Sequence, residues 1–244
     1  VKRVVDDLGE NINPGIEIER EVNEIIHKAF KTASKYSNIK VEGIYTHLSS
    51  ADYDNDYTLK QLSIFKKCVD RIESIIGTVK YKHCSASNGI LNYPDSYYNL
   101  VRSGIIMYGY KSFDKTLEKI DLKPVCKLKS KITFLKEVDE DISIGYGRKF
   151  ITTRKSKIAT VPIGYADGIR RCYKGDVVIA GKRCPIVGNI CMDSLMVDVT
   201  DLDNVCVGLD VYIWDNDIIT VDEVAFKSNQ INYEVISTIS DRVP

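Results

Sequence analysis

One tyrosine stands in a setting that favours chemistry, in the string IGYADG at residues 163–168. The flanking glycine and the Asp-Gly pair predict a turn after a strand, which presents the phenol of Tyr165 instead of packing it into a core. A phenol in water loses its proton only near about pH 10, so it acts as a base where cations or hydrogen-bond donors favour the phenolate. The string is therefore typical either of an acid–base tyrosine or of a turn tyrosine whose ring lies over a sheet.

Two further polar residues occur in predicted strands of the first half of the chain. His47, in YTHLSS, follows a short β-branched run, at the end of an α/β strand where barrel active sites are built. Arg102 lies in the apolar string VRSGII, and burying an arginine without a partner costs much free energy. Each has a structural alternative, since His47 would also cap a sheet and Arg102 would also form a salt bridge.

The loop HCSASNG at residues 83–89 consists mostly of small polar residues. Its hydroxyls and free backbone amides suit a phosphate group, although such a string is also an ordinary turn. Cys191, in GNICMD, invites a nucleophile hypothesis, but no histidine follows His83 in the chain to activate it. A buried, inert thiol is the favoured interpretation of Cys191.

The spacing of apolar residues predicts the framework for the first of these groups. Helical periodicity over 17–36 and 58–76 alternates with short strand-like runs at 41–48, 79–84 and 101–110. This alternation is typical of βα units and a parallel sheet.

The framework changes near residues 112–122. Beyond them, β-rich runs separated by Gly, Asp and Asn replace the helices until a helical segment at 221–228, and INYEV at 231–235 reads as strand sequence. We therefore expect a mainly antiparallel β domain. The β-rich runs are 124–138, 157–164, 176–180, 184–187, 195–199 and 211–219.

Composition excludes several classes of protein. The 244 residues hold 34 Lys+Arg and 34 Asp+Glu, a balance that gives no electrostatic reason to expect a nucleic-acid or acidic-membrane partner. No apolar run approaches the roughly 18 residues of a membrane span, and three scattered histidines without ligand spacing predict no metal site. Seven cysteines without a CxxC pair favour a reducing, cytoplasmic setting. The chain begins and ends in mid-pattern, from which we expect a longer parent protein.

Taken in order, these strings resemble the alanine racemase family. The matching strings are YTHLSSAD, HCSASNGILNYP, VRSGIIMYGY, LKPVCKLKSKI, GYGRKF, ATVPIGYADGIRR, PIVGNICMD, INYEV and RVP, from about residue 38 to the end. That family has an N-terminal (β/α)8 barrel, which binds pyridoxal 5'-phosphate, and a C-terminal β domain. The resemblance implies that residues 1–118 are the C-terminal half of a TIM-type barrel and that 119–244 are the β domain, which carries the catalytic tyrosine.

The resemblance also implies roles for individual residues. Tyr165 matches the catalytic tyrosine, one of two bases on opposite faces of the substrate Cα. Arg102 matches the arginine that faces the pyridine nitrogen, and His47 matches the histidine that orients this arginine. Met192 matches a backbone contact to the substrate carboxylate. The family's phosphate-binding positions are matched by Ser87, Gly104, Ile105 and Tyr233.

The activity implied is the interconversion of L-alanine and D-alanine, which supplies D-alanine for cell-wall peptidoglycan. The active unit implied is a homodimer, in which the tyrosine and the methionine reach into the partner subunit's barrel. Serine is an alternative substrate, although Tyr233 mildly favours alanine by resemblance. The related barrel decarboxylases fit less well, because IGYADG and ICMD belong to the racemase pattern.

The chain also departs from the family pattern. The second base, a lysine that forms the cofactor Schiff base in a segment like VKANAYGHG, has no counterpart here, and VDDLGE at 5–10 is only an echo of the family's DTGMxRLG. The order Ser85–Asn88 differs from the commoner ANSA. A whole barrel takes about 250 residues, more than twice the length before the predicted boundary. We therefore expect about four barrel strands to be missing and the chain to be inactive alone, either as part of an enzyme or as a non-catalytic remnant.

Overall fold

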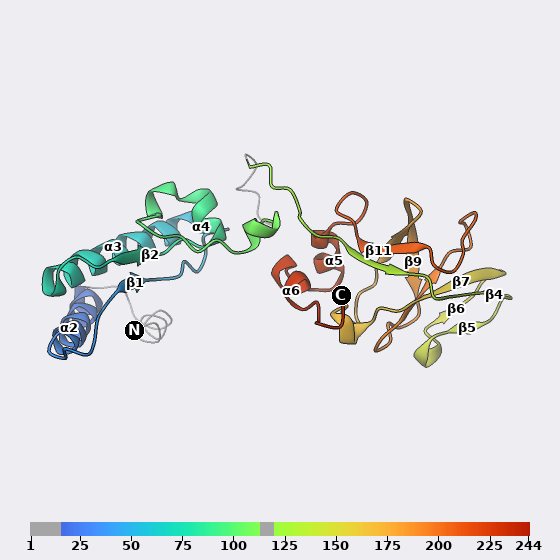
Figure 1. Ribbon diagram of the computed structural model, residues 1–244, viewed down its shortest axis with the longest axis horizontal. Coiled ribbons are helices and arrows are strands. Elements are labelled where there is room, and N and C mark those ends of the chain that lie inside the picture. Colours follow the sequence, from blue (N-terminus) through green and yellow to red (C-terminus); the bar gives the residue numbers. More distant parts are fainter. Residues whose placement is uncertain (1–15, 113–119) are drawn as a thin grey trace. The chain divides into compact units, whose positions relative to one another are not determined.

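The computed structural model describes residues 16–112 and 120–244, which form two compact units (Figure 1). The first unit comprises residues 16–107 and 120–122, and the second comprises 108–112 and 123–244. The echo VDDLGE and most of the expected boundary segment lie outside the described residues. Within the described ranges, no helix is long and apolar enough to cross a membrane.

The first unit combines helices with a parallel strand pair, as the alternating periodicity predicts. Strands β1 and β2 run parallel, with Gly43 opposite Tyr81 and Tyr45 opposite His83. The elements up to the start of the second unit are α2 (Ile16–Ala33), β1 (Gly43–Tyr45), α3 (Asn55–Ile76), β2 (Tyr81–His83), α4 (Ser87–Asn92) and the 3₁₀ turns η1 (Pro94–Ser96) and η2 (Ile105–Tyr108).

Helix α3 shows why these residues form this framework. The Asp54 side chain caps its first turn by accepting a hydrogen bond from the Tyr57 N–H at 2.9 Å, and Gly77, at a φ of 81°, ends it. Phe65 and Val69, four residues apart on one face, pack with Cys84, just beyond β2. A second cluster joins α2 and α3 to the strands through Ile26, Ile72 and Val79. These contacts fix the carboxyl ends of β1 and β2.

The prediction of a strand over 101–110 is wrong. Residues 101–104 are irregular and are followed by η2. The Arg102 N–H donates a hydrogen bond to the Ser85 carbonyl at 2.9 Å, but η2 follows at once and no ladder forms. Arg102 therefore lies beside the β2 end without being part of the sheet.

The second unit is an antiparallel β domain, which confirms the predicted fold class. Its main sheet has seven strands in the order β3-β11-β8-β9-β10-β7-β4. The strands are β3 (Leu128–Lys131), β4 (Phe134–Val138), β7 (Ser156–Val161), β8 (Asp176–Ile179), β9 (Lys182–Val187), β10 (Leu195–Asp198) and β11 (Asp210–Trp214), with a small separate pair, β5 (Ser143–Ile144) and β6 (Phe150–Ile151).

Buried aliphatic side chains from several strands form the core of this sheet. Val177, Val197 and Val211 are fully buried. The predicted run 211–219 ends early as a strand, because the Asp215 carboxylate accepts backbone N–H bonds from residues 217–219 and closes a turn.

Two helices follow β11, namely α5 (Val221–Lys227) and α6 (Asn232–Ser237). The interpretation of INYEV as a strand is therefore wrong. The Glu234 side chain accepts a hydrogen bond from the Ile231 N–H at 3.1 Å, which starts a helix at this point.

An ion-pair network ties α5 to the sheet. Arg183 of β9 donates from both terminal nitrogens to the Glu223 carboxylate, at 2.6 and 2.7 Å, and Lys227 lies 2.8 Å from the same carboxylate. The hydrogen bonds from Arg183, and then those from Lys227, lower the pKa of Glu223 to about 2. The folded unit therefore favours the ionised form of Glu223.

This pair predicts a defined acid sensitivity. Because the pKa of Glu223 is lower in the folded state, its stabilisation is complete above about pH 4.5 and is lost as the pH falls towards about 2. We expect Glu223→Gln to reduce the free energy of unfolding by about 1–2 kcal/mol at pH 7 and by much less at pH 2.5. Urea unfolding at both pH values measures this difference.

Glu137→Gln is the matched control, because Glu137 pairs with Lys155 at 3.0 Å while both side chains are more than half exposed. Because solvent screens an exposed pair, its effect should be much smaller than that of Glu223→Gln at pH 7. Equal effects of the two substitutions at pH 7 would contradict the prediction.

Candidate active site

The Arg102 guanidinium lies at the carboxyl ends of β1 and β2 and is held by several acceptors at once. Its Nη1 donates to His83 Nδ1 at 2.5 Å. Its Nη2 has three acceptors, which are the Thr46 carbonyl at 3.0 Å, His47 Nδ1 at 3.2 Å and the Cys84 carbonyl at 3.2 Å.

All four acceptors of Arg102 are neutral. Burial, and then the nearby Arg102 charge, lower the pKa of His83, so its ring remains an acceptor near neutral pH. Among the described residues no carboxylate contacts Arg102, so the salt-bridge alternative does not hold for these residues. Arg102 therefore keeps a full positive charge that nothing described here neutralises.

Aromatic contacts add to this arrangement. The rings of Tyr45 and His83 stack at a centroid distance of 5.1 Å and an interplanar angle of 4°. The Arg102 guanidinium carbon lies 5.6 Å from the centre of the Tyr45 ring. These contacts follow from the register that places Tyr45 opposite His83.

Sequence reasoning missed His83 as a member of this group. The sequence places His83 at the start of a polar loop, whereas in the structure it is the last residue of β2 and contacts Arg102 directly. One feature of the sequence does point to His83: both His47 and His83 end strand-like runs. The carboxyl ends of parallel strands meet at one edge of a sheet, so the two histidines are expected to lie close together.

Ser87 and Gly104 form a second feature of the first unit. The Gly104 N–H donates to the Ser87 hydroxyl at 3.1 Å, and Ser87 is buried. A Cβ at position 104 would come within 3.2 Å of the Ser87 hydroxyl oxygen, so glycine leaves a small cradle there. Ile105, the next residue, is also buried. The structure thus brings His47, Ser87, Arg102, Gly104 and Ile105 into one unit.

Tyr165 belongs to the second unit and opens the 3₁₀ turn η5 (Tyr165–Asp167). Its N–H donates to the Cys191 carbonyl at 3.0 Å, and the Ala166 N–H donates to the Met192 carbonyl at 2.8 Å. A Cβ at Gly164 would lie 2.4 Å from the Cys191 carbonyl oxygen, so only glycine permits this approach. The Tyr165 turn and Met192 are therefore neighbours.

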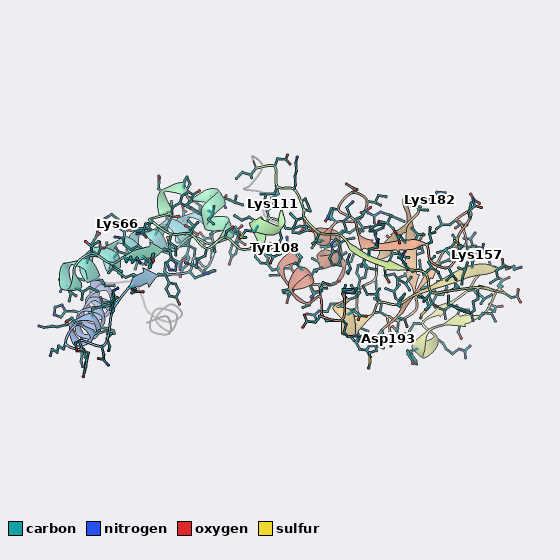
Figure 2. All side chains as sticks on the ribbon, in the orientation of Figure 1. Lys66, Tyr108, Lys111, Lys157, Lys182 and Asp193 are labelled. Atoms are coloured by element: carbon teal, nitrogen blue, oxygen red, sulfur yellow. The ribbon has the colours of Figure 1, made fainter. Side chains whose placement is uncertain are left out.

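Both side chains face outwards, since Tyr165 is 43% and Met192 56% exposed. Asp193, the next residue of the Met192 loop, is labelled in Figure 2. An open pocket of about 300 Å³ lies beside Tyr165, and Arg170, Arg171 and Thr238 are among the residues that line it. The two arginines give this pocket a positive lining, which suits an anionic group.

Two other expected residues are in this unit. Tyr233 lies on α6 and not on a strand. Cys191 was expected to be buried, but it is only half-buried. Its Sγ lies 3.7 Å from the Asn189 carbonyl oxygen.

Comparison with known proteins gives consistent matches. The family models for the N-terminal and C-terminal domains of alanine racemase match residues 15–112 and 125–244. An alanine racemase from Halothermothrix orenii is 41% identical over 220 residues, which cover 88% of this chain and 58% of that protein. One from Methanococcus maripaludis is 38% identical and matches 100% of this chain and 69% of its own length. The chain thus spans about three-fifths to two-thirds of these relatives.

Solved structures agree with these matches. Alanine racemase from Clostridium difficile 630 in complex with cycloserine is 36% identical, with a TM-score of 0.82 over 99% of this chain and 65% of that one. Alanine racemase from Bacillus anthracis with bound L-Ala-P is 32% identical, with a TM-score of 0.83 over 91% and 58%. With both domains matched in order and relatives near 40% identity across most of its length, the chain belongs to the alanine racemase family.

Proposed function

We propose that this chain supplies the arginine- and tyrosine-bearing part of a pyridoxal-phosphate-dependent racemase that interconverts L-alanine and D-alanine. The observation that carries the proposal is the Arg102 guanidinium, which is held at the strand ends by four neutral acceptors. A cation fixed there without an anionic partner suits a ligand that offers it a lone pair. The pyridine nitrogen of pyridoxal phosphate is such a ligand.

When bound, pyridoxal phosphate supplies an electron-withdrawing system that makes the substrate Cα–H acidic. Arg102 would donate a hydrogen bond to the ring nitrogen and, because a guanidinium does not lose its proton near neutral pH, would leave that nitrogen unprotonated. His47 and His83 orient Arg102, the first as the family resemblance implies and the second from its 2.5 Å contact. Through this contact Arg102 would limit the delocalisation of charge into the ring and so disfavour side reactions.

The residues proposed for the phosphate group fit an anion. Ser87 offers a hydroxyl, and the Gly104 cradle leaves room that a side chain would fill. Ile105 contributes through its backbone next to this cradle, and Tyr233 contributes a phenol from α6 of the second unit. Ser87 and Tyr233 offer hydroxyl donors, Gly104 offers room, and none of the four residues brings a negative charge.

Tyr165 acts on the substrate Cα as one of two proton-transferring groups. Racemisation removes a proton from one face of Cα and returns one to the other, so a single base cannot do both. The open pocket beside Tyr165, with Arg170 and Arg171 in its lining, gives space for a small amino acid and suits its carboxylate group. The Met192 backbone is proposed to contact the substrate carboxylate.

The second base is the cofactor-bearing lysine, whose segment has no match in this chain. We therefore propose that residues 1–118 are half of a barrel that another polypeptide segment completes, and that 119–244 form the β domain. In the proposed homodimer, Tyr165 and Met192 serve the partner subunit's barrel. All seven cysteines are free thiols, which supports the proposed cytoplasmic setting. The product D-alanine would serve the synthesis of peptidoglycan.

The proposal predicts activity on complementation. Mixed with pyridoxal phosphate and the lysine-bearing half of a related racemase, the chain should convert L-alanine to D-alanine, whereas each half alone should not. Tyr165→Phe should lower kcat by about 10²- to 10⁴-fold, because it removes the transferable proton. Chiral chromatography of the products measures the rate.

Tyr36→Phe is the control for this loss, because Tyr36 is 55% exposed and follows α2. Its rate should equal that of the parent chain. If a correctly assembled complex does not racemise alanine, the alternative that the chain is a non-catalytic remnant is favoured. If serine is racemised faster than alanine, serine is the preferred substrate.

The contact between His83 and Arg102 predicts a separate effect. In the complemented enzyme, His83→Phe keeps a ring to stack on Tyr45 but removes the acceptor for Arg102, and we expect pyridoxal phosphate to bind about tenfold more weakly. His27→Phe changes a histidine that contacts Arg71 on the helices and should leave binding unchanged. Equilibrium dialysis measures the affinity, and equal binding by the His83 variant and the parent would exclude this role.

A further inference from the structure

The carboxylate of Asp167 lies at the centre of the contacts that hold the Tyr165 turn. It is only 7% exposed, and its Oδ2 accepts a hydrogen bond from the Gly164 N–H at 2.8 Å. Its Oδ1 lies 3.4 Å from Arg242 Nε. The Asp167 main-chain carbonyl accepts a further bond from the Ser240 N–H at 3.2 Å. One residue thus joins the start of the turn to the segment after α6.

The same segment presses against the end of the turn. Gly168 has a φ of 111°, and a Cβ there would lie 2.4 Å from the Thr238 carbonyl oxygen. On its other side the turn is bonded through Tyr165 and Ala166 to the Met192 loop, as described above. The turn is therefore held between two backbone segments. Among the described residues, an ion pair (Asp167 with Arg242) is found on the Thr238 side alone.

This arrangement also joins two parts of the proposed site within one unit. Helix α6 carries Tyr233 and runs directly into the segment that contacts Asp167. The helix itself is anchored by Asn232, which donates to the Lys111 carbonyl at 2.6 Å and to Asp222 at 2.8 Å (Lys111 is labelled in Figure 2). A displacement of the segment would therefore affect both tyrosines.

We propose that Asp167 and Arg242 form a clamp that positions Tyr165 for proton transfer and fixes the position of its turn relative to α6. The inference rests on the proposed function of Tyr165. Asp167 acts here as a positioning residue, through the backbone of the turn and not by contact with substrate. The negative charge of Asp167 is essential to the clamp. An asparagine at this position would still accept the hydrogen bond from the Gly164 N–H, but its amide NH2 would face the Arg242 guanidinium, which is also a donor.

The first test reads the order of the turn without catalysis. In the chain as it stands, Asp167→Asn and Arg242→Gln should each speed amide hydrogen exchange at Tyr165 and Ala166 by about tenfold. Arg242→Lys restores the charge and should return exchange close to that of the parent. Exchange measured by NMR resolves both amides.

Asp215→Asn is the matched control. Asp215 is 8% exposed in the same unit and also accepts backbone N–H bonds, but it closes a turn after β11. We expect it to lower the Tm without changing exchange at Tyr165. Parent-like exchange in both clamp variants, or an equal rise in the Asp215 variant, would overturn the proposal.

The second test uses the complemented racemase. Asp167→Asn should lower kcat by about 10- to 100-fold, because a small misplacement of a reacting group is enough for such a loss. KM should change by less than about twofold. The primary deuterium isotope effect should rise most for the enantiomer whose α-hydrogen faces Tyr165. A raised KM with unchanged kcat would overturn the clamp.

The two tests separate the two claims. If Tyr165→Phe racemises alanine as fast as the parent, the proposed function of Tyr165 fails, while the exchange rates still decide whether the clamp orders the turn.

Discussion

The arrangement of the first unit depends on one requirement, which is that a half-buried guanidinium without an anionic partner must find enough neutral acceptors. Arg102 finds two histidine nitrogens and two carbonyl oxygens, which come from residues at the ends of β1 and β2. They converge only because the strands are parallel and because Tyr45 is in register with His83. That register in turn depends on the buried contacts of α2 and α3 with the strands. The geometry of the candidate site therefore depends on the packing of the core.

In the second unit, the corresponding constraint is that the backbone around the exposed Tyr165 must be fixed in position. An antiparallel sheet gives rigid strand ends, and the Tyr165 turn is fastened to two neighbouring segments through its backbone. Gly164 and Gly168 allow approaches that any side chain would block. The position of the Tyr165 turn thus comes from close backbone contacts, while the phenol itself stays exposed.

Several of these features could be predicted from the sequence. Helical periodicity predicted α3 and α5, and the β-rich runs predicted the antiparallel unit, because these patterns depend on local burial. The pairing of Arg102 with His47 followed from the family resemblance and agrees with their 3.2 Å contact. The contact of His83 with Arg102 was not predicted: both histidines end strand-like runs, but the register that brings these ends together is a long-range property. The short INYEV run was equally compatible with strand or helix, and the Glu234 cap decided between them. Asp167 read only as part of a turn, because its partner Arg242 lies 75 residues further along the chain.

The central claim is that Arg102 donates to the ring nitrogen of pyridoxal phosphate and keeps it unprotonated. The most direct measurement is the ¹⁵N NMR chemical shift of cofactor labelled at that nitrogen, bound to the complemented enzyme between about pH 6 and pH 9. We predict the shift of an unprotonated, hydrogen-bonded pyridine that stays constant over this range. A shift typical of protonated pyridinium, or one that titrates as in free cofactor, would contradict the claim.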